Sequence, residues 1–160
     1  MRRTQIAAGL FLASLATIVG AYIFEYGFDL APCELCLKQR IPYYIGIPLA
    51  GVAAILASTR PTIARLLLAA FAVAMLVGAG LGVYHAGVEW KFWQGPTACA
   101  GGADNVSGIT DVLKAMREQA VVRCDEAAWR FLGLSLAGWN VLISLALAGI
   151  ACLGVRKSGA

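Results

Sequence analysis

The stretch IAAGLFLASLATIVGAYIF, residues 6–24, contains no charged side chain and decides the class of fold. At about 1.5 Å rise per residue, a helix of this length can cross a hydrocarbon core about 30 Å thick. Three further apolar stretches follow, at residues 41–58, 63–84 and 131–153. We therefore expect an all-α integral membrane fold: a bundle of four transmembrane helices that forms a single membrane domain, residues 1–160.

The composition of the whole chain favours a membrane protein over a soluble one. Of its 160 residues, 60% are hydrophobic and 14% are charged, and the mean hydropathy is +0.76. The net charge of +4 does not indicate a nucleic-acid-binding protein, because the 13 basic residues are scattered and form no basic stripe with interleaved aromatic residues. No nucleic-acid partner is expected.

The first apolar stretch could instead belong to a secretory signal peptide, since Arg2 and Arg3 precede it. It is longer than the apolar region of such a peptide, which has about 7 to 15 residues, and it lacks a clear A-x-A cleavage site. We expect a retained helix.

Basic side chains predict how the helices are oriented in the membrane. On one side of the membrane the expected helices are flanked by six basic residues and no acidic one: Arg2, Arg3, Arg60, Arg65, Arg156 and Lys157. By the positive-inside rule this side is cytoplasmic, and both termini lie on it. All nine acidic residues fall in the two opposite loops, at about residues 25–40 and 85–130.

The longer outer loop is expected to carry a short amphipathic helix. Apolar residues recur there at helical spacing, at Ile109, Val112, Leu113, Met116 and Ala120. The apolar face of such a helix would rest on the membrane surface or pack on the top of the bundle, and the sequence leaves both arrangements open.

Four of the five cysteines lie in the outer loops: Cys33, Cys36, Cys99 and Cys124. The predicted orientation therefore places four thiols in an oxidising compartment. Cys152 stands apart, near the cytoplasmic end of the last helix, and is expected to be a small apolar packing residue.

Cys33 and Cys36 form a C-x-x-C pair just before the second apolar stretch. This spacing allows a reversible disulfide, and a helix N-terminus would stabilise a thiolate there. If the helix begins near Pro32, the two cysteines share one face with Arg40, which then lies one turn from Cys36. Because Pro42 disfavours a straight helix, a kink or a later start is equally open. Arg40 would stabilise the Cys36 thiolate and the charge on an acceptor's oxygen, or it would be only an interfacial anchor.

Cys99 and Cys124 are too far apart in sequence for C-x-x-C chemistry but can close a disulfide loop. An unstrained bridge of this length would stabilise the closed loop by about 3.5 kcal/mol, so a purely structural staple is a serious alternative. Small residues at positions 98 and 100–102 would leave the Cys99 sulfur open to an incoming thiolate. Only one of the two pairs has zinc-knuckle spacing, so no metal is expected.

His85 is the only histidine and falls at the outer end of the third apolar stretch. Its expected depth in the membrane is close to that of Arg40, so both could line one site, where they would hydrogen-bond a quinone carbonyl and handle its proton. The alternative is an interfacial histidine with a single hydrogen bond. An aromatic belt at the membrane border is expected from Trp90, Trp93, Tyr43, Tyr44 and Trp129.

With these features the sequence resembles the disulfide bond formation protein B (DsbB) family over essentially its whole length. The C-x-x-C pair alone would be weak evidence, but its place before the second of four spans, together with Arg40 and a split second pair, makes the match specific. The matching residues are Cys33-x-x-Cys36-x-x-x-Arg40, Tyr84-His85, Gly95-Pro96 leading to Cys99, Cys124 and the stretch Leu134–Asn140.

The resemblance implies a quinone-linked thiol oxidoreductase of the bacterial inner membrane, with several spans and its redox cysteines on the periplasmic side. A periplasmic DsbA-like protein of thioredoxin fold would be oxidised by Cys99 with Cys124. These two would be reoxidised by Cys33 with Cys36, and ubiquinone or menaquinone would take the electrons. Cys99 would form the mixed disulfide with the partner.

The resemblance also implies roles for residues around the quinone. Cys36 would face the quinone, and Arg40 would bind it and promote the thiolate charge. His85 matches a less diagnostic position but is expected at the same site, whereas Asn140 is expected only to pack between helices.

Two alternatives of other classes remain. A vitamin K epoxide reductase-like enzyme also combines a four-helix bundle, a C-x-x-C pair and a quinone, but its active pair lies near the end of a later helix. A non-enzymatic membrane protein whose loops are merely stapled by two disulfides would not reduce a quinone when a reduced partner is added.

Overall fold

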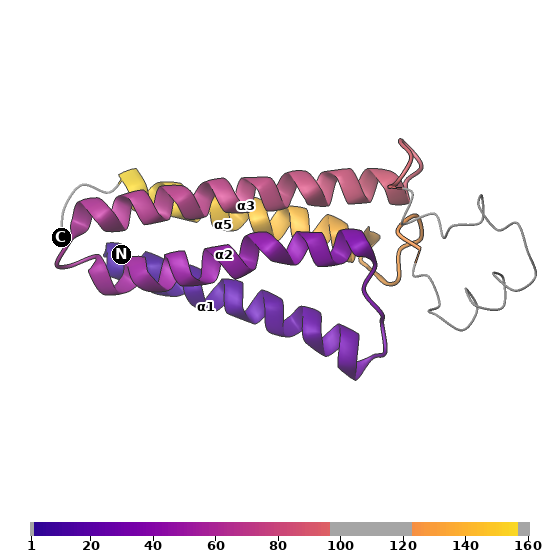
Figure 1. Cartoon of the computed structure of the whole chain (residues 1–160), viewed down its shortest axis with the longest axis horizontal. Helices are drawn as coiled ribbons and strands as arrows, with labels where there is room; N and C mark the ends of the chain where they lie inside the picture. Colours follow the sequence, from indigo (N-terminus) through magenta and orange to yellow (C-terminus); the bar gives the residue numbers. More distant parts are fainter. Residues whose placement is uncertain (1, 97–122, 157–160) are drawn as a thin grey trace, which may run out of the picture.

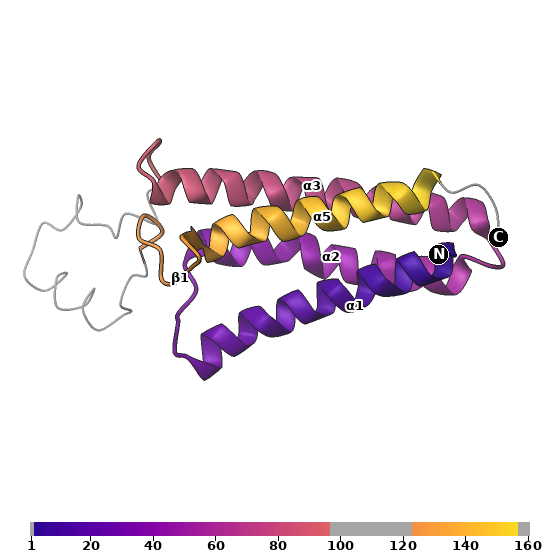
Figure 2. The same ribbon diagram turned by 180° about the vertical axis from the view of Figure 1, so that it is seen from behind.

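The computed structural model describes residues 2–96 and 123–156, which form an elongated bundle of long helices (Figure 1). α1 begins and α5 ends at the same end of the bundle, as the view from behind also shows (Figure 2). There the side chain of Arg3 donates a hydrogen bond from Nε to the carbonyl oxygen of Gly154, at 3.2 Å. The elements are α1 (Arg3–Tyr22), the π-helical turn η1 (Ile23–Gly27), α2 (Glu34–Leu56), α3 (Pro61–Glu89), β1 (Arg130–Phe131), β2 (Leu134–Ser135) and α5 (Leu136–Arg156).

Three helical segments within the described residues are long and apolar enough to cross a membrane: Arg3–Gly27, Pro61–Glu89 and Leu136–Arg156. α2 packs beside them but is not one of the three. Its apolar part begins only after Gln39 and Arg40, and from Ile41 to Leu56 it measures about 24 Å, less than a hydrocarbon core of about 30 Å. The expected all-helical membrane fold is therefore confirmed for the described residues, whereas the expected number of four spans is not established.

α2 begins at Glu34, before the apolar stretch at residue 41, and contains Pro42. Of the two starts that the sequence left open, near Pro32 or later, the structure has the earlier one. Pro42 cannot donate to the carbonyl one turn earlier, which weakens a helix locally. It is buried against α3, where a Cβ added at Gly78 would lie 3.3 Å from the Cβ of Pro42. This tertiary packing offsets the lost hydrogen bond, so the helix continues through Pro42.

α5 begins at Leu136, after the start expected at residue 131. The residues before it form a two-stranded antiparallel hairpin, in which Arg130 pairs with Ser135. Its turn consists of Leu132 and Gly133, which both have positive φ, 52° and 82°, as a tight hairpin turn of this hand requires. A short apolar run does not distinguish strand from helix, which is why the pattern alone missed the hairpin.

The other end of the long loop also differs from the expectation. α3 continues to Glu89, so His85 lies inside the helix and not at its end. The expected amphipathic helix at residues 109–120 and Cys99 lie outside the described residues.

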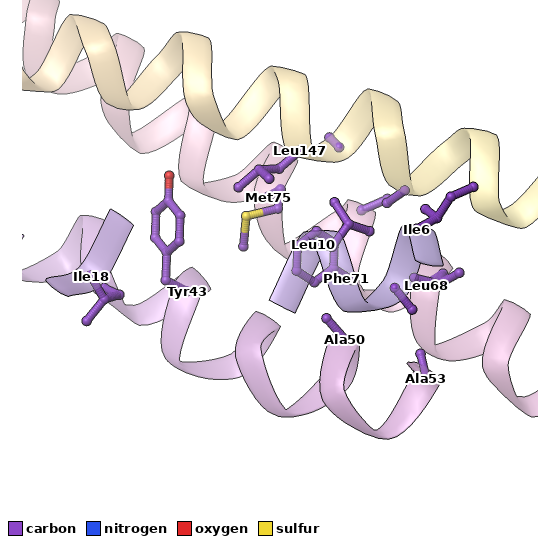
Figure 3. Packing of buried hydrophobic residues seen from close by; sticks show 14 residues of the cluster. Ile6, Leu10, Ile18, Tyr43, Ala50, Ala53, Leu68, Phe71, Met75 and Leu147 are labelled. Atoms are coloured by element: carbon purple, nitrogen blue, oxygen red, sulfur yellow. The ribbon is translucent and has the colours of Figure 1, made fainter. Parts of the chain in front are cut away.

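Apolar side chains from all four long helices form the core (Figure 3). Leu10, Phe71 and Met75 are fully buried, and Tyr43 is only 2% exposed. The placement of Tyr43 in an aromatic belt was therefore wrong.

Small residues allow α3 and α5 to approach closely near the end of the bundle where α3 ends and α5 begins. A Cβ added at Gly82 of α3 would lie 2.8 Å from Val141 Cγ2 and 3.4 Å from Asn140 Nδ2, both on α5. The first of these contacts is closer than van der Waals packing permits, so the helix interface requires glycine at this position.

We predict that Gly82→Ala lowers the melting temperature of the protein in detergent, whereas Gly80→Ala does not. Alanine is favoured over glycine in a helix by about 1 kcal/mol, and at Gly80 nothing lies within 4 Å of the new Cβ. At Gly82 the new Cβ would meet the β-branched side chain of Val141 and the backbone carbonyl of Ala137, so the overpacking penalty, up to about 3 kcal/mol, exceeds this gain. Thermal unfolding followed by circular dichroism measures both variants. Equal melting temperatures would show that the α3–α5 interface is looser than described.

Candidate functional site

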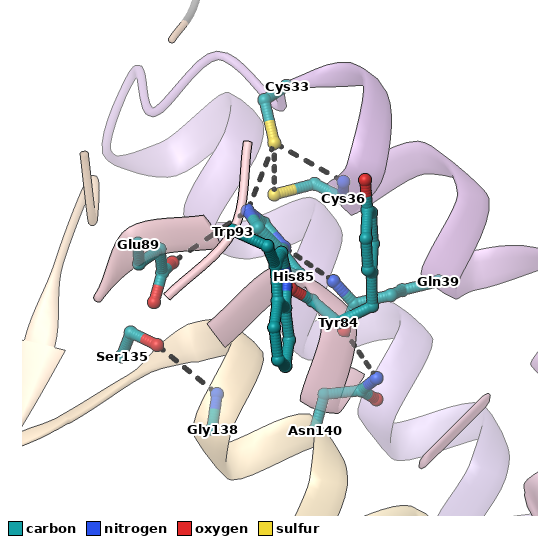
Figure 4. Close-up of polar contacts among 10 residues, drawn as sticks. All are labelled: Cys33, Cys36, Gln39, Tyr84, His85, Glu89, Trp93, Ser135, Gly138 and Asn140. Carbon is teal, nitrogen blue, oxygen red and sulfur yellow. Dashed lines mark hydrogen bonds and ion pairs between the residues drawn. The ribbon is translucent and has the colours of Figure 1, made fainter. Parts of the chain in front are cut away.

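The C-x-x-C pair lies where α2 begins, beside the last turns of α3 (Figure 4). Cys33 is the N-cap of α2, and its Sγ accepts a hydrogen bond from the backbone N–H of Cys36 at 3.3 Å. Both cysteines are free thiols, and their Sγ atoms are in hydrogen-bond contact at 3.0 Å. A helix N-terminus favours negative charge, so this position suits a thiolate.

Cys33, which precedes α2, is the group on which this negative charge is stabilised. Its pKa is lowered from an ordinary value of 9.0 to about 4, chiefly by the hydrogen bond with Cys36. Burial opposes the shift, and the hydrogen bond with His85 adds to it. The backbone N–H of Cys36 acts in the same direction, so Cys33 is poised to be a thiolate while Cys36 keeps the proton that they share.

His85 faces the cysteine pair from α3 and is only 3% exposed. Its Nε2 lies 3.6 Å from Cys33 Sγ and 3.8 Å from Glu89 Oε1, and its Nδ1 lies 2.6 Å from Gln39 Nε2. The sequence singled out His85 as a possible neighbour of Arg40 at a quinone site, but the reactive side chain that the structure places beside it is Cys33.

Arg40 lies on α2 and forms an ion pair with Glu25. The sequence had suggested the Cys36 thiolate as its partner. Its Nη1 donates to Glu25 Oε2 at 2.6 Å, and its guanidinium lies 5.0 Å from the centre of the Tyr22 ring. The π-helical turn η1 carries Glu25 into this position. A π-helical turn inside a helix is often found at a functional site.

An apolar cavity of about 440 Å³ opens between α1, α2 and α5. The ribbon of α1 diverges from α2 toward this end of the bundle (Figure 1). Cys36 and Arg40 both line the cavity, together with the aromatic side chains of Phe24, Trp129, Phe131 and Trp139. A mostly apolar pocket with a few convergent polar groups fits a flat ring that bears polar substituents.

The polar groups of this cavity come from α1, α2 and α5. They are Thr17, Cys36, Gln39, Arg40, Tyr43 and Asn140. His85 is not among the described residues that line it, so the structure separates His85, on the Cys33 side, from Arg40, on the cavity side. The sequence had placed these two residues at one shared site.

Cys124 is disulfide-bonded and has no exposed surface. It packs in one buried cluster with Cys33, Leu35 and Val88, and Cys36 contacts the same cluster. Cys124, the described member of the expected second pair, therefore lies against the first pair. Cys99, its expected partner, lies outside the described residues.

Ion pairs hold the segment around Cys124 against the end of α3. Asp125 Oδ2 lies 2.5 Å from Lys91 Nζ and 2.9 Å from Arg123 Nη2. Arg123 and then Lys91 lower the pKa of the Asp125 carboxyl. These pairs are exposed, so they contribute little stability and serve mainly to orient the segment.

Cys33, Cys36 and His85 form the one group in the described part of the chain whose donor atoms are close enough to hold a metal ion, all within 4.8 Å. Bound metal would occupy both sulfur atoms and block their redox chemistry. Cys152 is free and exposed on α5, toward the opposite end from the site.

Sequence reasoning missed three side chains of this site: Gln39, Glu25 and Glu89. Gln39 lies one turn after Cys36, and this spacing in a helix entering a membrane was the available signal. Asn140 had been assigned to helix packing, but its Nδ2 donates to Gln39 Oε1 at 2.6 Å.

Comparisons with known proteins identify the family of this chain. A family model described as "Disulfide bond formation protein DsbB" matches residues 3–154. Disulfide bond formation protein B of Albidiferax ferrireducens is 30% identical over 156 residues, covering 89% of this chain and 86% of the relative. The protein of that name from Nitrosococcus oceani is 28% identical over 158 residues, covering 94% and 89%. No solved structure gives a significant match. The chain belongs to the DsbB family of membrane oxidoreductases that generate disulfide bonds.

Proposed function

We propose that this disulfide-generating oxidoreductase transfers electrons from a periplasmic DsbA-like protein, through its two cysteine pairs, to a membrane quinone. The observation that carries the proposal is the position of the C-x-x-C pair between the apolar cavity and Cys124. Cys36 lines the apolar cavity with Arg40, while Cys33 packs against the disulfide-bonded Cys124. One sulfur thus faces an acceptor, and the other faces the second pair.

The cavity is the proposed quinone site. Its apolar walls suit the ring and the first part of the isoprenoid tail, and Arg40 would donate a hydrogen bond to a carbonyl oxygen while remaining paired with Glu25. A bound quinone would take up two electrons and two protons to give a quinol. Cys33 and Cys36 would lose two electrons as their S–S bond forms; the Cys36 thiol would release one proton, and the second would come from solvent because Cys33 is already a thiolate. Whether ubiquinone or menaquinone is used follows from the membrane in which the protein works.

Exchange between the two pairs would run through Cys124 and Cys33. After the partner has reduced the second pair, the thiolate of Cys124 attacks Cys33 in the Cys33–Cys36 disulfide and releases Cys36. Cys99 then attacks Cys124, which re-forms the second disulfide and leaves Cys33 and Cys36 reduced. The complete burial of Cys124 leaves Cys99 as the sulfur for the partner's thiolate.

The proposed topology has four spans, with α2 as the fourth and with the cysteines on the periplasmic side of the inner membrane. Two features support an even number of crossings: α1 begins and α5 ends at one end of the bundle, and Arg3 is bonded to Gly154 there. Basic residues also gather toward that end. By the positive-inside rule this end is cytoplasmic, and both termini lie on the cytoplasmic side. Those within the described residues are Arg2, Arg3, Arg60, Arg65 and Arg156.

The direct test is quinone reduction by the purified protein in detergent when a reduced DsbA-like protein is added. Oxidation of the partner together with loss of quinone absorbance supports the proposal, and Cys36→Ser serves as the inactive control. A protein that is merely stapled by disulfides would leave both the partner and the quinone unchanged.

We predict that alkylation of Cys33 by iodoacetamide persists at acidic pH and falls only as the pH drops through about 4, where the thiolate is protonated. Cys36→Ala should raise the midpoint toward the ordinary value because it removes the largest stabilising contact, and His85→Ala should raise it by less. Mass mapping of the pH-dependent label measures this. A wild-type midpoint near 9 would contradict a stabilised Cys33 thiolate.

Arg40→Ala should raise the quinone concentration needed for half-maximal turnover by about tenfold or more, since a hydrogen bond to a charged group contributes about 1.5–3 kcal/mol. Arg40→Lys should recover only part of the loss because lysine lacks the planar guanidinium group with its paired N–H donors. Lys38→Ala is the matched control, since Lys38 pairs with the partly exposed Glu34. Unchanged quinone dependence in Arg40→Ala would remove this residue from the site.

Interrupting each pair separately should reveal the order of electron flow. In Cys124→Ala the unpaired Cys99 thiol should attack the disulfide of the oxidised partner and trap a mixed disulfide with it, whereas Cys36→Ala should abolish quinone reduction yet still oxidise one equivalent of reduced partner. Non-reducing gels with mass mapping, combined with single-turnover quinone absorbance, read out both results. Cys152→Ser should behave as wild type. Capture of the partner at Cys36 would reverse the proposed order.

A further inference from the structure

A chain of hydrogen bonds crosses three helices and ends at Cys33. It starts at Tyr43 of α2, whose hydroxyl donates to Asn140 Oδ1 of α5 at 2.8 Å. Asn140 Nδ2 then donates to Gln39 Oε1 of α2 at 2.6 Å, and Gln39 Nε2 contacts His85 Nδ1 of α3 at 2.6 Å. His85 Nε2 finally faces Cys33 Sγ at 3.6 Å (Figure 4).

The direction of this chain fixes the protonation of the imidazole. An amide nitrogen can only donate, so His85 Nδ1 must accept from Gln39 and carries no hydrogen. A neutral imidazole then holds its single hydrogen on Nε2, the nitrogen that faces Cys33. We propose that Gln39 and Asn140 are positioning residues that hold His85 in the Nε2–H tautomer and so aim a hydrogen-bond donor at the Cys33 sulfur.

Burial gives this arrangement its strength. Tyr43, Gln39 and His85 are 2%, 6% and 3% exposed, so water does not compete for their polar atoms. Rotating the side-chain amide of Asn140 or Gln39 alone by 180° would place two donors or two acceptors opposite each other. Buried polar atoms would then be left unpaired. The chain can therefore reverse only as a whole, which keeps the tautomer well defined.

Glu89 offers the same N–H a second acceptor. Its side chain is buried, its Oε1 lies 3.8 Å from His85 Nε2, and its Oε2 has no hydrogen-bond partner among the described residues. The titratable groups around the imidazole are thus Cys33, Cys36 and Glu89, while α5 contributes the uncharged Asn140. When Cys33 becomes part of a disulfide and loses its negative charge, Nε2–H can turn to Glu89.

This inference rests on the proposed function for the role of Cys33, but its first test needs no turnover. His85 is the only histidine, so ¹⁵N-histidine labelling of the full-length protein in detergent reports one imidazole. In the reduced protein, nitrogen-15 NMR should show a protonated Nε2 and an unprotonated Nδ1. A protonated Nδ1 in the wild type would overturn the proposal, whether or not the protein reduces quinone.

Asn140→Asp is the sharpest variant because it keeps the side-chain shape and can only accept. It should draw Gln39 Nε2 toward the new carboxylate, turn Gln39 Oε1 toward the imidazole and move the hydrogen from Nε2 to Nδ1. Gln5→Glu makes the same amide-to-acid change at an exposed position of α1, at the opposite end of the bundle, and should leave the tautomer unchanged. An unchanged tautomer in Asn140→Asp would contradict the positioning role.

The consequence for Cys33 is tested by the same variant. Asn140→Asp should lower the rate of Cys33 alkylation, measured below the wild-type midpoint, by about tenfold, which corresponds to one pKa unit. In a His85→Ala background the substitution should have no further effect, because it acts through the imidazole. If the alkylation rate of Cys33 still falls in that background, the introduced carboxylate acts directly on Cys33, and the proposal fails. Gln39→Leu, which removes the contact to Nδ1, should yield mixed tautomers and gives an independent second variant.

Discussion

Cys33 caps the N-terminus of α2, and the positions of the other groups in the site depend on this helix start. It places Cys36, Gln39 and Arg40 within the first two turns, so that one sulfur and the guanidinium reach the cavity. The capping bond from the Cys36 N–H also bends the pair together until the sulfur atoms are 3.0 Å apart. A helix that began at Ile41, after the cysteines, would leave them in a loop without either the dipole or the fixed separation.

The bundle divides the two sulfur atoms between different environments. α3 and the Cys124 segment surround Cys33 with buried polar and sulfur groups, whereas α1 leaves an apolar cavity beside Cys36. The π-helical turn at the end of α1 brings Glu25 to Arg40, which neutralises a charge that would otherwise be costly at the membrane border. A buried polar region beside Cys33 and an apolar cavity beside Cys36 therefore border a single C-x-x-C pair.

The sequence predicted the parts of this structure that depend on local pattern. Apolar length predicted the membrane helices, and helical spacing predicted Cys36 and Arg40 one turn apart on the helix that the structure shows as α2. It did not reveal the partners of these residues, because Glu25 meets Arg40, and Asn140 meets Gln39, only after separate helices have packed. Tyr43 was misplaced for the same reason. An aromatic residue near a predicted helix start looks interfacial until its hydroxyl donates to Asn140 and contacts Ser144 inside the bundle.

We propose that the dithiol of Cys33 and Cys36 delivers its electrons to a quinone in the adjacent cavity. The most direct measurement is a quinone titration, without partner and without oxygen, of protein in which only Cys33 and Cys36 are reduced and Cys124 remains disulfide-bonded, with quinol formed and thiols lost counted together. We expect one quinol for each protein molecule and the loss of two thiols, mapped by mass spectrometry to a Cys33–Cys36 disulfide. Quinol formed without loss of these two thiols, or no quinol at all from a fully reduced pair, would contradict it.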